Sequence, residues 1–420
     1  MRGPESESAA SPPVAASGPA AGTAELRREV LGVVFVTILI DFIGFSVLFP
    51  VLPLYADRLG ATPLQVGLIL TLYALAQLLF LPVWGWVSDR VGRRPVILVS
   101  LLGTALSFLL LAGAQSVGTI YAARVLAGFF AASIGTAQAV VTDVTSPAER
   151  AGGMGVIGVA FGAGMVVGPM LGGFLAAWHE LLPFYAIAAL AFANLVVAWR
   201  FLPESKRLTS APPDWKALAR CFVPTPVRLA LAVHERRIGL YLYLFLHLFT
   251  AFAVLESMIT LYLGRRFGAD EIDAALVFAW IGIVLVVTQG WLLRRLVPAL
   301  GEFRLVLVGL GLMSLGLLAV AMAPSYGWFF AIGTVIAVGN GLAFPTFTSL
   351  YSKACQAHQA GELLGQSQSM ATTGRILGPL WAGLVMGTVG LGAPFLVAGA
   401  LMLAGLAIVA GARRLLVEEG

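Results

Sequence analysis

Charged residues are scarce in this chain. Asp, Glu, Lys and Arg together make up 11% of its 420 residues, whereas a soluble domain carries roughly 25%. Hydrophobic residues make up 59%, and 48 glycines come in addition. A soluble protein of this composition would expose apolar surface on every side and aggregate, so the composition excludes a globular cytosolic enzyme.

Cysteine is nearly absent as well, with Cys221 and Cys355 the two in the chain. Two cysteines cannot build a disulfide framework or hold a metal by themselves, and both fall in segments that we expect to face the reducing cytoplasm. The sequence shows no nucleophile–base constellation, no phosphate-binding glycine loop and no cluster of metal ligands. We therefore expect no enzyme activity, no metal site and no bound cofactor.

Charge of one sign is not concentrated anywhere either. The net charge is +5, and the basic residues lie in short segments scattered along the chain, which argues against a nucleic-acid binder. Positions 1–29 contain no apolar core and are therefore not a signal peptide. Their Ala, Ser, Pro and Gly content predicts a disordered tail.

Long apolar stretches make up most of the remaining chain. A bilayer core about 30 Å thick needs roughly 20 apolar residues in a helix, and twelve stretches approach or exceed that length. The sequence thus predicts an all-α membrane protein with spans at 31–53, 64–87, 95–114, 119–142, 152–177, 184–202, 238–263, 274–293, 305–323, 327–349, 364–390 and 394–412.

Lys and Arg predict the orientation of these spans, because basic residues accumulate on the cytoplasmic side. With both ends inside, the cytoplasmic segments hold 21 of the 26 basic residues, and the outer segments hold three, Arg58, Arg265 and Arg266. We therefore expect the N- and C-termini to be cytoplasmic in a multi-pass protein of the bacterial inner membrane.

The chain also repeats itself. Gly164, Gly168-Pro169 and Gly173 in the fifth span recur 210 residues later as Gly374, Gly378-Pro379 and Gly383 in the eleventh. Two duplicated six-span halves are typical of transporters, whose substrate site lies between the halves near the midplane. The predicted order is tail 1–29, first bundle 30–202, cytoplasmic linker 203–237, second bundle 238–413 and C-terminal tail 414–420.

The loop between the second and third spans carries the most specific motif. Gly85 permits close approach of two helices. Asp89 lies at a helix end, where its carboxylate can accept hydrogen bonds from the backbone amides at the N-terminus of another helix. Three arginines surround Gly92. The motif residues are Gly85, Asp89, Arg90, Gly92, Arg93 and Arg94.

This loop resembles the signature Gly-x-x-x-Asp-Arg-x-Gly-Arg-Arg of the major facilitator superfamily. The resemblance implies the major facilitator fold, with 12 transmembrane helices in two pseudo-symmetric six-helix bundles. It also implies a gating latch, in which Asp89 meets the start of span 11 and Arg93 pairs with Asp143. Basic residues that only set topology are the alternative. The loop after span 8 reads Arg294-Arg295 and lacks the aspartate, so a second latch is not expected.

Two further segments resemble motifs of this superfamily. Arg124 to Gly128 resembles an Arg-x-x-x-Gly segment implicated in proton transfer, although snorkelling of Arg124 to the surface would also explain it. An arginine at that depth costs about 2.5–3.5 kcal/mol to insert. The glycine-rich stretch in span 5 resembles the motif of proton-coupled antiporters, with simple helix packing as the alternative; its residues are Gly164, Gly168, Pro169, Gly172 and Gly173.

Buried acids are the remaining candidates for proton coupling. Asp41 lies about ten residues, or ~15 Å, inside span 1, in a segment that resembles the opening of tetracycline-type drug–proton antiporters. It could bind and release a proton there, or serve only as a structural hydrogen-bonding acid. Glu256 is the second such acid, and with Arg124 these two form the proposed coupling set. Polar residues that could line a substrate cavity are Gln77, Gln138, His247, Gln289, Asn340 and Arg375, with packing the preferred interpretation for His247.

The sequence therefore predicts a secondary transporter, similar to tetracycline and multidrug efflux proteins, that exports drugs or small amphiphilic molecules in exchange for protons. Its expected partners are a small-molecule substrate, protons and the lipid bilayer, and we expect it to work as a monomer without a cofactor. Two alternatives stay open at this point: a proton symporter or facilitator that imports a small metabolite, and a membrane sensor or scaffold that transports nothing.

Overall fold

The structure is a computed structural model that describes residues 21–145, 149–205, 236–354 and 360–418. Every regular element in these ranges is a helix, as the sequence predicts. The first half contains α1 (Ala21–Arg58), α2 (Pro63–Val91), α3 (Arg93–Ala112), α4 (Val117–Phe129), α5 (Ser133–Val144), α6 (Arg150–Ala176) and α7 (Leu182–Phe201). The second contains α10 (Arg236–Phe267), α11 (Glu271–Val287), η1 (Thr288–Leu292), α12 (Leu293–Leu300), α13 (Glu302–Met322), α14 (Trp328–Ala354), α15 (Ala360–Thr388), α16 (Ala393–Gly411) and η2 (Arg414–Glu418).

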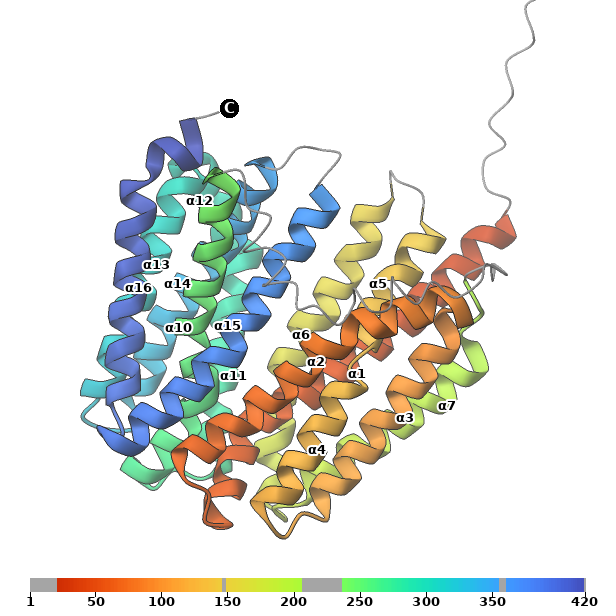
Figure 1. Cartoon of the computed structure of the whole chain (residues 1–420), viewed down its shortest axis with the longest axis horizontal. Coiled ribbons are helices and arrows are strands. Elements are labelled where there is room, and N and C mark those ends of the chain that lie inside the picture. Colours follow the sequence, from red (N-terminus) through yellow and green to blue (C-terminus); the bar gives the residue numbers. More distant parts are fainter. Residues whose placement is uncertain (1–20, 146–148, 206–235, 355–359, 419–420) are drawn as a thin grey trace, which may run out of the picture.

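These helices form two bundles that stand side by side (Figure 1). Across the described residues, eleven stretches are long and apolar enough to cross a membrane, with α4–α5 counting as one and α11–α12 as another. The helix at the eleventh predicted span, α15, has 29 residues and is not among them; its first half carries polar residues such as Gln366 and Gln368.

The duplication is visible in the way the helices begin. Thr62 caps α2 by accepting a hydrogen bond from the Gln65 amide, and the Gln65 side chain accepts one from the Thr62 amide. Asp270 and Asp273 form the same reciprocal capping box at the start of α11. Each box satisfies two of the amide groups that a helix start leaves unpaired.

The fourth predicted span, 119–142, is broken into α4 and α5 at Phe130–Ala132. Backbone groups freed inside a membrane need partners, and the Ser100 hydroxyl of α3 supplies them: it donates to the Phe130 carbonyl and accepts from the amides of Ala132 and Ser133. Gly103 leaves room for the Phe130 ring, because a Cβ there would stand 2.0 Å from that ring.

Both predicted tails differ from expectation at their inner edges. Residues 21–29, expected to be disordered, are helical because the run of helix-forming residues from Ala24 to Glu29 continues α1 toward the N-terminus. At the other end, η2 lies on α10, where the Leu416 carbonyl accepts hydrogen bonds from Arg237 (3.0 Å) and Tyr241 (3.1 Å). Residues 1–20, most of the predicted linker, Cys221 and Cys355 lie outside the described ranges.

The glycine-rich stretch of α6 packs directly on α1. A Cβ on Gly164 would stand 2.6 Å from Cβ of Phe42, and one on Gly168 would stand 1.9 Å from Oγ of Ser46. The Ser46 hydroxyl donates to the Gly164 carbonyl at 2.8 Å. Only glycine allows the two backbones to come this close.

The second bundle repeats this seam. A Cβ on Gly374 of α15 would stand 2.9 Å from Cβ of Phe249, and one on Gly378 would stand 2.8 Å from Cβ of Ala253, both on α10. The last glycine of each seam reaches the opposite bundle: Gly173 packs on the start of α11, and Gly383 packs on the start of α2. The glycine spacing read from the sequence therefore sets both the packing within each bundle and the contact between bundles.

Contacts between the bundles gather at the end of the molecule away from the termini. Arg58 pairs there with Glu271, and Arg265 pairs with Asp57 at 2.6 Å. Deeper in, the Thr260 hydroxyl donates to the Phe49 carbonyl, and the Thr71 hydroxyl donates to the Ile376 carbonyl. The ribbons separate toward the end that carries both termini (Figure 1), so the bundles are joined at the end that the sequence predicts to be outside.

The seam can be tested with two alanines on one helix. Gly168→Ala should lower the free energy of unfolding by about 1–3 kcal/mol, because the methyl group overlaps Ser46 and the seam must open. Gly162→Ala is the matched control, since no atom lies within 4 Å of its Cβ position. Thermal unfolding of the purified proteins in detergent measures both, and equal melting temperatures would contradict the seam.

Candidate functional site

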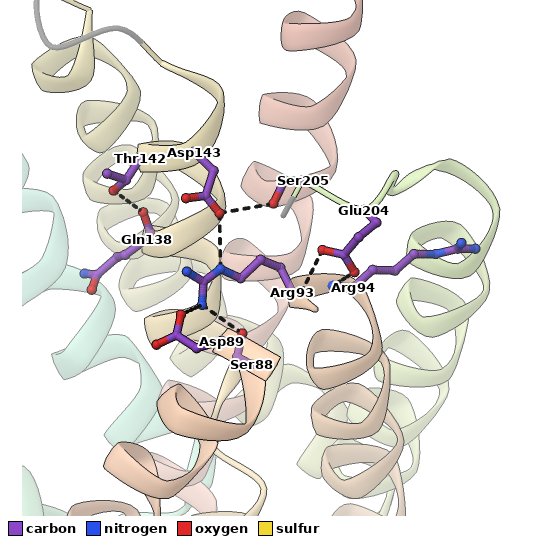
Figure 2. Close-up of polar contacts among 9 residues, drawn as sticks. All are labelled: Ser88, Asp89, Arg93, Arg94, Gln138, Thr142, Asp143, Glu204 and Ser205. Atoms are coloured by element: carbon purple, nitrogen blue, oxygen red, sulfur yellow. Dashed lines mark hydrogen bonds and ion pairs between the residues drawn. The ribbon is translucent and has the colours of Figure 1, made fainter. Parts of the chain in front are cut away.

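Arg93, the first residue of α3, is the centre of a network at the end of the first bundle that carries the N-terminus. Its guanidinium binds Asp89 of α2 at 2.9 Å and Asp143 of α5 at 3.1 Å, and it donates to the Ser88 hydroxyl at 3.2 Å (Figure 2). The Arg93 side chain is only 11% exposed. The Arg93–Asp143 contact predicted from the sequence is present, and it ties α2, α3 and α5 together.

Glu204 adds a contact that the motif does not contain. Its carboxylate accepts from the backbone amides of Arg93 and Arg94 at 2.8 and 3.1 Å, and so caps the positive end of α3 (Figure 2). Gly92 precedes this cap with a φ of 102°, and a Cβ there would stand 2.2 Å from Glu204 Oε2. Ser205 donates to Asp143 at 3.4 Å. The beginning of the predicted linker is thus held on the motif loop.

The second bundle contains a counterpart of opposite polarity. Glu302 is the first residue of α13, as Arg93 is of α3, and each follows a glycine of positive φ, Gly301 or Gly92. Glu302 pairs with Lys353 near the end of α14 at 2.8 Å. Lys353 stands 210 residues after Asp143, which is the offset of the glycine seams. The second bundle therefore has an ion pair at the position that corresponds to Arg93–Asp143, with acid and base exchanged.

Asp41 lies within α1 beside the break in span 4. Its carboxylate accepts a hydrogen bond from the hydroxyl of Ser133, the first residue of α5. The Asp41 side chain is half-buried, and the next residue, Phe42, packs on Gly164 of the α6 seam. A movement along this seam would therefore displace the only carboxylate in the membrane-spanning part of α1.

Arg124 of α4 is 3% exposed, and its guanidinium lies 4.3 Å from the centre of the Tyr73 ring on α2. Gly128, one turn further along, brings the helices together, since its Cβ would stand 2.4 Å from the Tyr73 carbonyl oxygen. A desolvated cation–π contact is worth about 2 kcal/mol, which offsets much of the insertion cost. The Arg-x-x-x-Gly spacing thus fixes Arg124 against Tyr73.

Glu256 and Arg375 form the corresponding charges of the second bundle. They lie on α10 and α15, close enough to interact electrostatically. α15 packs on α2 through the hydrogen bond of the Thr71 hydroxyl to the Ile376 carbonyl, and Tyr73 of α2 contacts Arg124. The helix that carries Arg375 is therefore a neighbour of the helix that holds Arg124. Glu256 also lines a small cavity whose other walls are apolar residues of α1 and α2, including Phe49 and Ile69.

The sequence matches the profile of the Major Facilitator Superfamily over residues 34–379. The chain belongs to the major facilitator superfamily. Among curated proteins, it is 29% identical to the tetracycline resistance protein of class B from Escherichia coli, over 83% of this chain and 86% of the relative. It is 28% identical to the mouse (Mus musculus) major facilitator superfamily domain-containing protein 10, over 90% of this chain and 91% of the relative.

Solved structures agree with this membership. The crystal structure of the human organic anion transporter MFSD10 is 28% identical, covers 91% of this chain and 99% of that chain, and has a TM-score of 0.66. A peptide transporter with 15% identity has a TM-score of 0.76, over 94% of this chain and 98% of that one, and shares the fold. The chain is therefore a transporter of the major facilitator fold and not an enzyme.

Not every residue of the facilitator motif lies where the sequence suggests. Gly85 was expected to permit close helix contact, but no described atom lies within 4 Å of its Cβ position, because the bundles are apart at this end. Arg90 stacks on Trp86 at 3.7 Å, and Arg94 donates to the Trp199 carbonyl. The contact of Asp89 with the start of span 11 involves side chains outside the described set and stays a prediction.

The cavity candidates are dispersed in this facilitator fold. His247 contacts the Leu401 carbonyl of α16 at 2.7 Å and stacks on Tyr243, which supports the packing interpretation over a cavity position. Gln138 is exposed on α5 and points away from Arg93 (Figure 2). Gln77 and Asn340 are half-buried, and Gln289 is exposed on the π-helical turn η1. Arg375 is the candidate that the structure brings to the other ionisable groups.

Three residues at these sites were not predicted from the sequence. Tyr73 and Ser133 are ordinary residues of apolar spans, and nothing in the local pattern marks them. Glu204 follows Pro203 at a helix end. The proline predicts that the helix stops there, but nothing predicts which residues Glu204 will contact. Each acquires its role from a neighbour at least 50 positions away.

The Glu302–Lys353 pair can be tested by exchanging its charges. Glu302→Lys and Lys353→Glu should each lower turnover roughly fivefold, since about 1 kcal/mol of coupling is lost and like charges face each other. The double exchange should recover most of the loss. Transport in proteoliposomes measures all three, and a double variant no better than the single ones would rule out a functional pair.

Proposed function

We propose that this facilitator is a proton-coupled antiporter that exports drugs or small amphiphilic molecules by alternating access. The proposal rests chiefly on Asp41, a half-buried carboxylate in mid-helix that contacts the α5 start and adjoins the α1–α6 seam. Arg124 and Glu256 complete the proposed coupling set. Protonation of these acids would compete with substrate for the same state of the bundles.

The glycine seams supply the movable part of this mechanism. They join α6 to α1 and α15 to α10 with little side-chain interlocking, and their last glycines touch the opposite bundle. Rocking of the bundles would change the contacts of Gly173 with α11 and of Gly383 with α2, and the seams would transmit this change to Phe42 and Asp41. The Arg93 and Glu302 networks would hold helix ends together within each bundle during this movement.

Proton entry is energetically sufficient for export. One proton that crosses a potential of 100 mV releases about 2.3 kcal/mol, and a tenfold pH gradient adds about 1.4 kcal/mol. Together they support a substrate gradient of a few hundred-fold for each proton. No cofactor besides the coupling proton enters this scheme.

The named relatives agree with export of small molecules, since several are tetracycline resistance proteins and one solved structure is titled an organic anion transporter. We assign the chain to the bacterial inner membrane with both termini in the cytoplasm, and we propose that it acts as a monomer, because both bundles that enclose the path belong to one chain.

The direction of transport separates the proposal from its alternatives. Cells lacking other efflux pumps and expressing this chain should accumulate less of a drug such as tetracycline or ethidium than cells with empty vector. A protonophore should raise accumulation to the control level. Lower accumulation with the protonophore would instead indicate a proton-driven importer, and no movement of any compound from a broad panel in liposomes would favour a sensor or scaffold.

Asp41→Asn should abolish proton-coupled export while the protein still inserts and stays monodisperse, because the amide keeps the shape of the carboxylate but cannot carry the proton. Ser133→Ala is the control at the same contact: it removes the hydrogen bond and leaves the carboxylate, so export should persist. Proton flux measured with a pH-sensitive dye in proteoliposomes reports the coupling. Undiminished flux in the Asp41 variant would remove this residue from the mechanism.

A further inference from the structure

Two arginines, one in each bundle, carry buried nitrogens without a hydrogen-bond partner. Among the described residues, Nε and Nη2 of Arg124 and Nε of Arg375 have no hydrogen-bond acceptor. A guanidinium presents donors and no acceptor, and a buried donor without a partner costs free energy. Such groups are positioned to receive an acceptor that is not part of the chain.

Arg375 is the more accessible of the two. It is half-buried on α15, next to Gly374 of the seam, and its guanidinium lies 5.4 Å from the centre of the Phe249 ring on α10. The α2–α15 contact between the Thr71 hydroxyl and the Ile376 carbonyl holds this part of α15 against the first bundle. Arg375 therefore lies on the part of α15 that packs against α2.

The charged side chains near this position differ in the partners that they have. Arg124 lies over the Tyr73 ring, so a second cation contacts α2, the helix on which this part of α15 packs. Asp41 is hydrogen-bonded to Ser133, and Glu256 is the acid that interacts with Arg375. No ion pair within 4.0 Å joins any of these four charged side chains among the described residues. A ligand carboxylate could approach Arg375 in competition with Glu256.

The surroundings suit an aromatic ligand. Phe45 and Phe49 of α1 extend the ring of Tyr73 on one side, and Phe344 of α14 lies 4.7 Å from Phe249 on the other. Rings next to a guanidinium bind flat apolar groups and exclude water from the charge. The region thus combines a cation with apolar walls.

We propose that Arg375 is a docking residue for the acidic group of an aromatic or amphiphilic carboxylate, with Arg124 adding positive potential across Tyr73 and Glu256 competing for the same guanidinium. The physiological meaning of this site rests on the proposed transport function, but its binding test does not require transport.

The experiment uses three probes that share one fluorophore and differ in charge: dansyl-glycine, uncharged dansyl-glycinamide and cationic dansyl-ethylenediamine. Their fluorescence is titrated with the full-length protein in nanodiscs of zwitterionic lipid, with empty nanodiscs as background. Dansyl-glycine should bind about tenfold or more tightly than dansyl-glycinamide, because it makes a charge-assisted hydrogen bond to Arg375.

Variants locate the preference. Arg375→Gln should remove the preference for dansyl-glycine over dansyl-glycinamide, and Arg375→Lys should retain part of it. Glu256→Gln should increase this preference, because the competing carboxylate is removed. Arg200→Gln, at an exposed arginine at the end of α7, should leave it unchanged. If Arg375→Gln does not fold, the Arg375→Lys and Glu256→Gln variants still test the inference, because the first should weaken the preference for the acid and the second should strengthen it.

Equal binding of the acid and the amide, or a preference that survives Arg375→Gln, would overturn the inference. Loss of the preference with unimpaired drug export would leave the proposed function standing. Intact anion binding without any efflux would contradict the proposed function and leave the docking site standing.

Discussion

Close contact of helix backbones through glycine is the constraint on which this molecule depends. Lipid chains are as apolar as leucine, so helices in a membrane associate through tight packing rather than through a hydrophobic driving force. Here α6 approaches α1 until a single methyl group on Gly168 would overlap Ser46, and α15 approaches α10 in the same way at Gly378. The same seams end in Gly173 and Gly383, which join the bundles to each other. Packing within a bundle and contact between bundles therefore cannot change independently.

The few charges are distributed according to the cost of burying them. At the helix ends, acids and bases form ion pairs or cap amides, as Arg93, Asp143 and Glu204 do. Within the spans of the first bundle, Arg124 has an aromatic ring as its partner, and Asp41 has a hydroxyl. Charges held by such weak partners can change state when a proton or a ligand arrives, which is what a transporter of this superfamily requires.

The two bundles share their helix starts and glycine seams but differ in the polarity of their ion pairs. The capping boxes of α2 and α11 repeat the same bonding pattern with different residues, and the glycine seams keep the same glycine spacing. The ion pairs at the bundle ends keep their positions but reverse their charges between Arg93–Asp143 and Glu302–Lys353. An ion pair can join two helix ends in either polarity, so searching the second half for the aspartate of the first could not find it.

Composition, span length and glycine spacing were enough to predict the helices and the duplication, because a membrane helix needs an apolar stretch of fixed length and close packing at small residues. The superfamily followed from the resemblance of the Gly85–Arg94 loop to its signature. The Arg93–Asp143 contact followed from the resemblance. The break at Phe130–Ala132, the cap by Glu204, the contact of Arg124 with the Tyr73 ring, and the orientation of His247 toward α16 did not. These depend on which face each helix turns to its neighbours, and the hydrophobic pattern is nearly uniform around a membrane helix, so only the packed structure decides it.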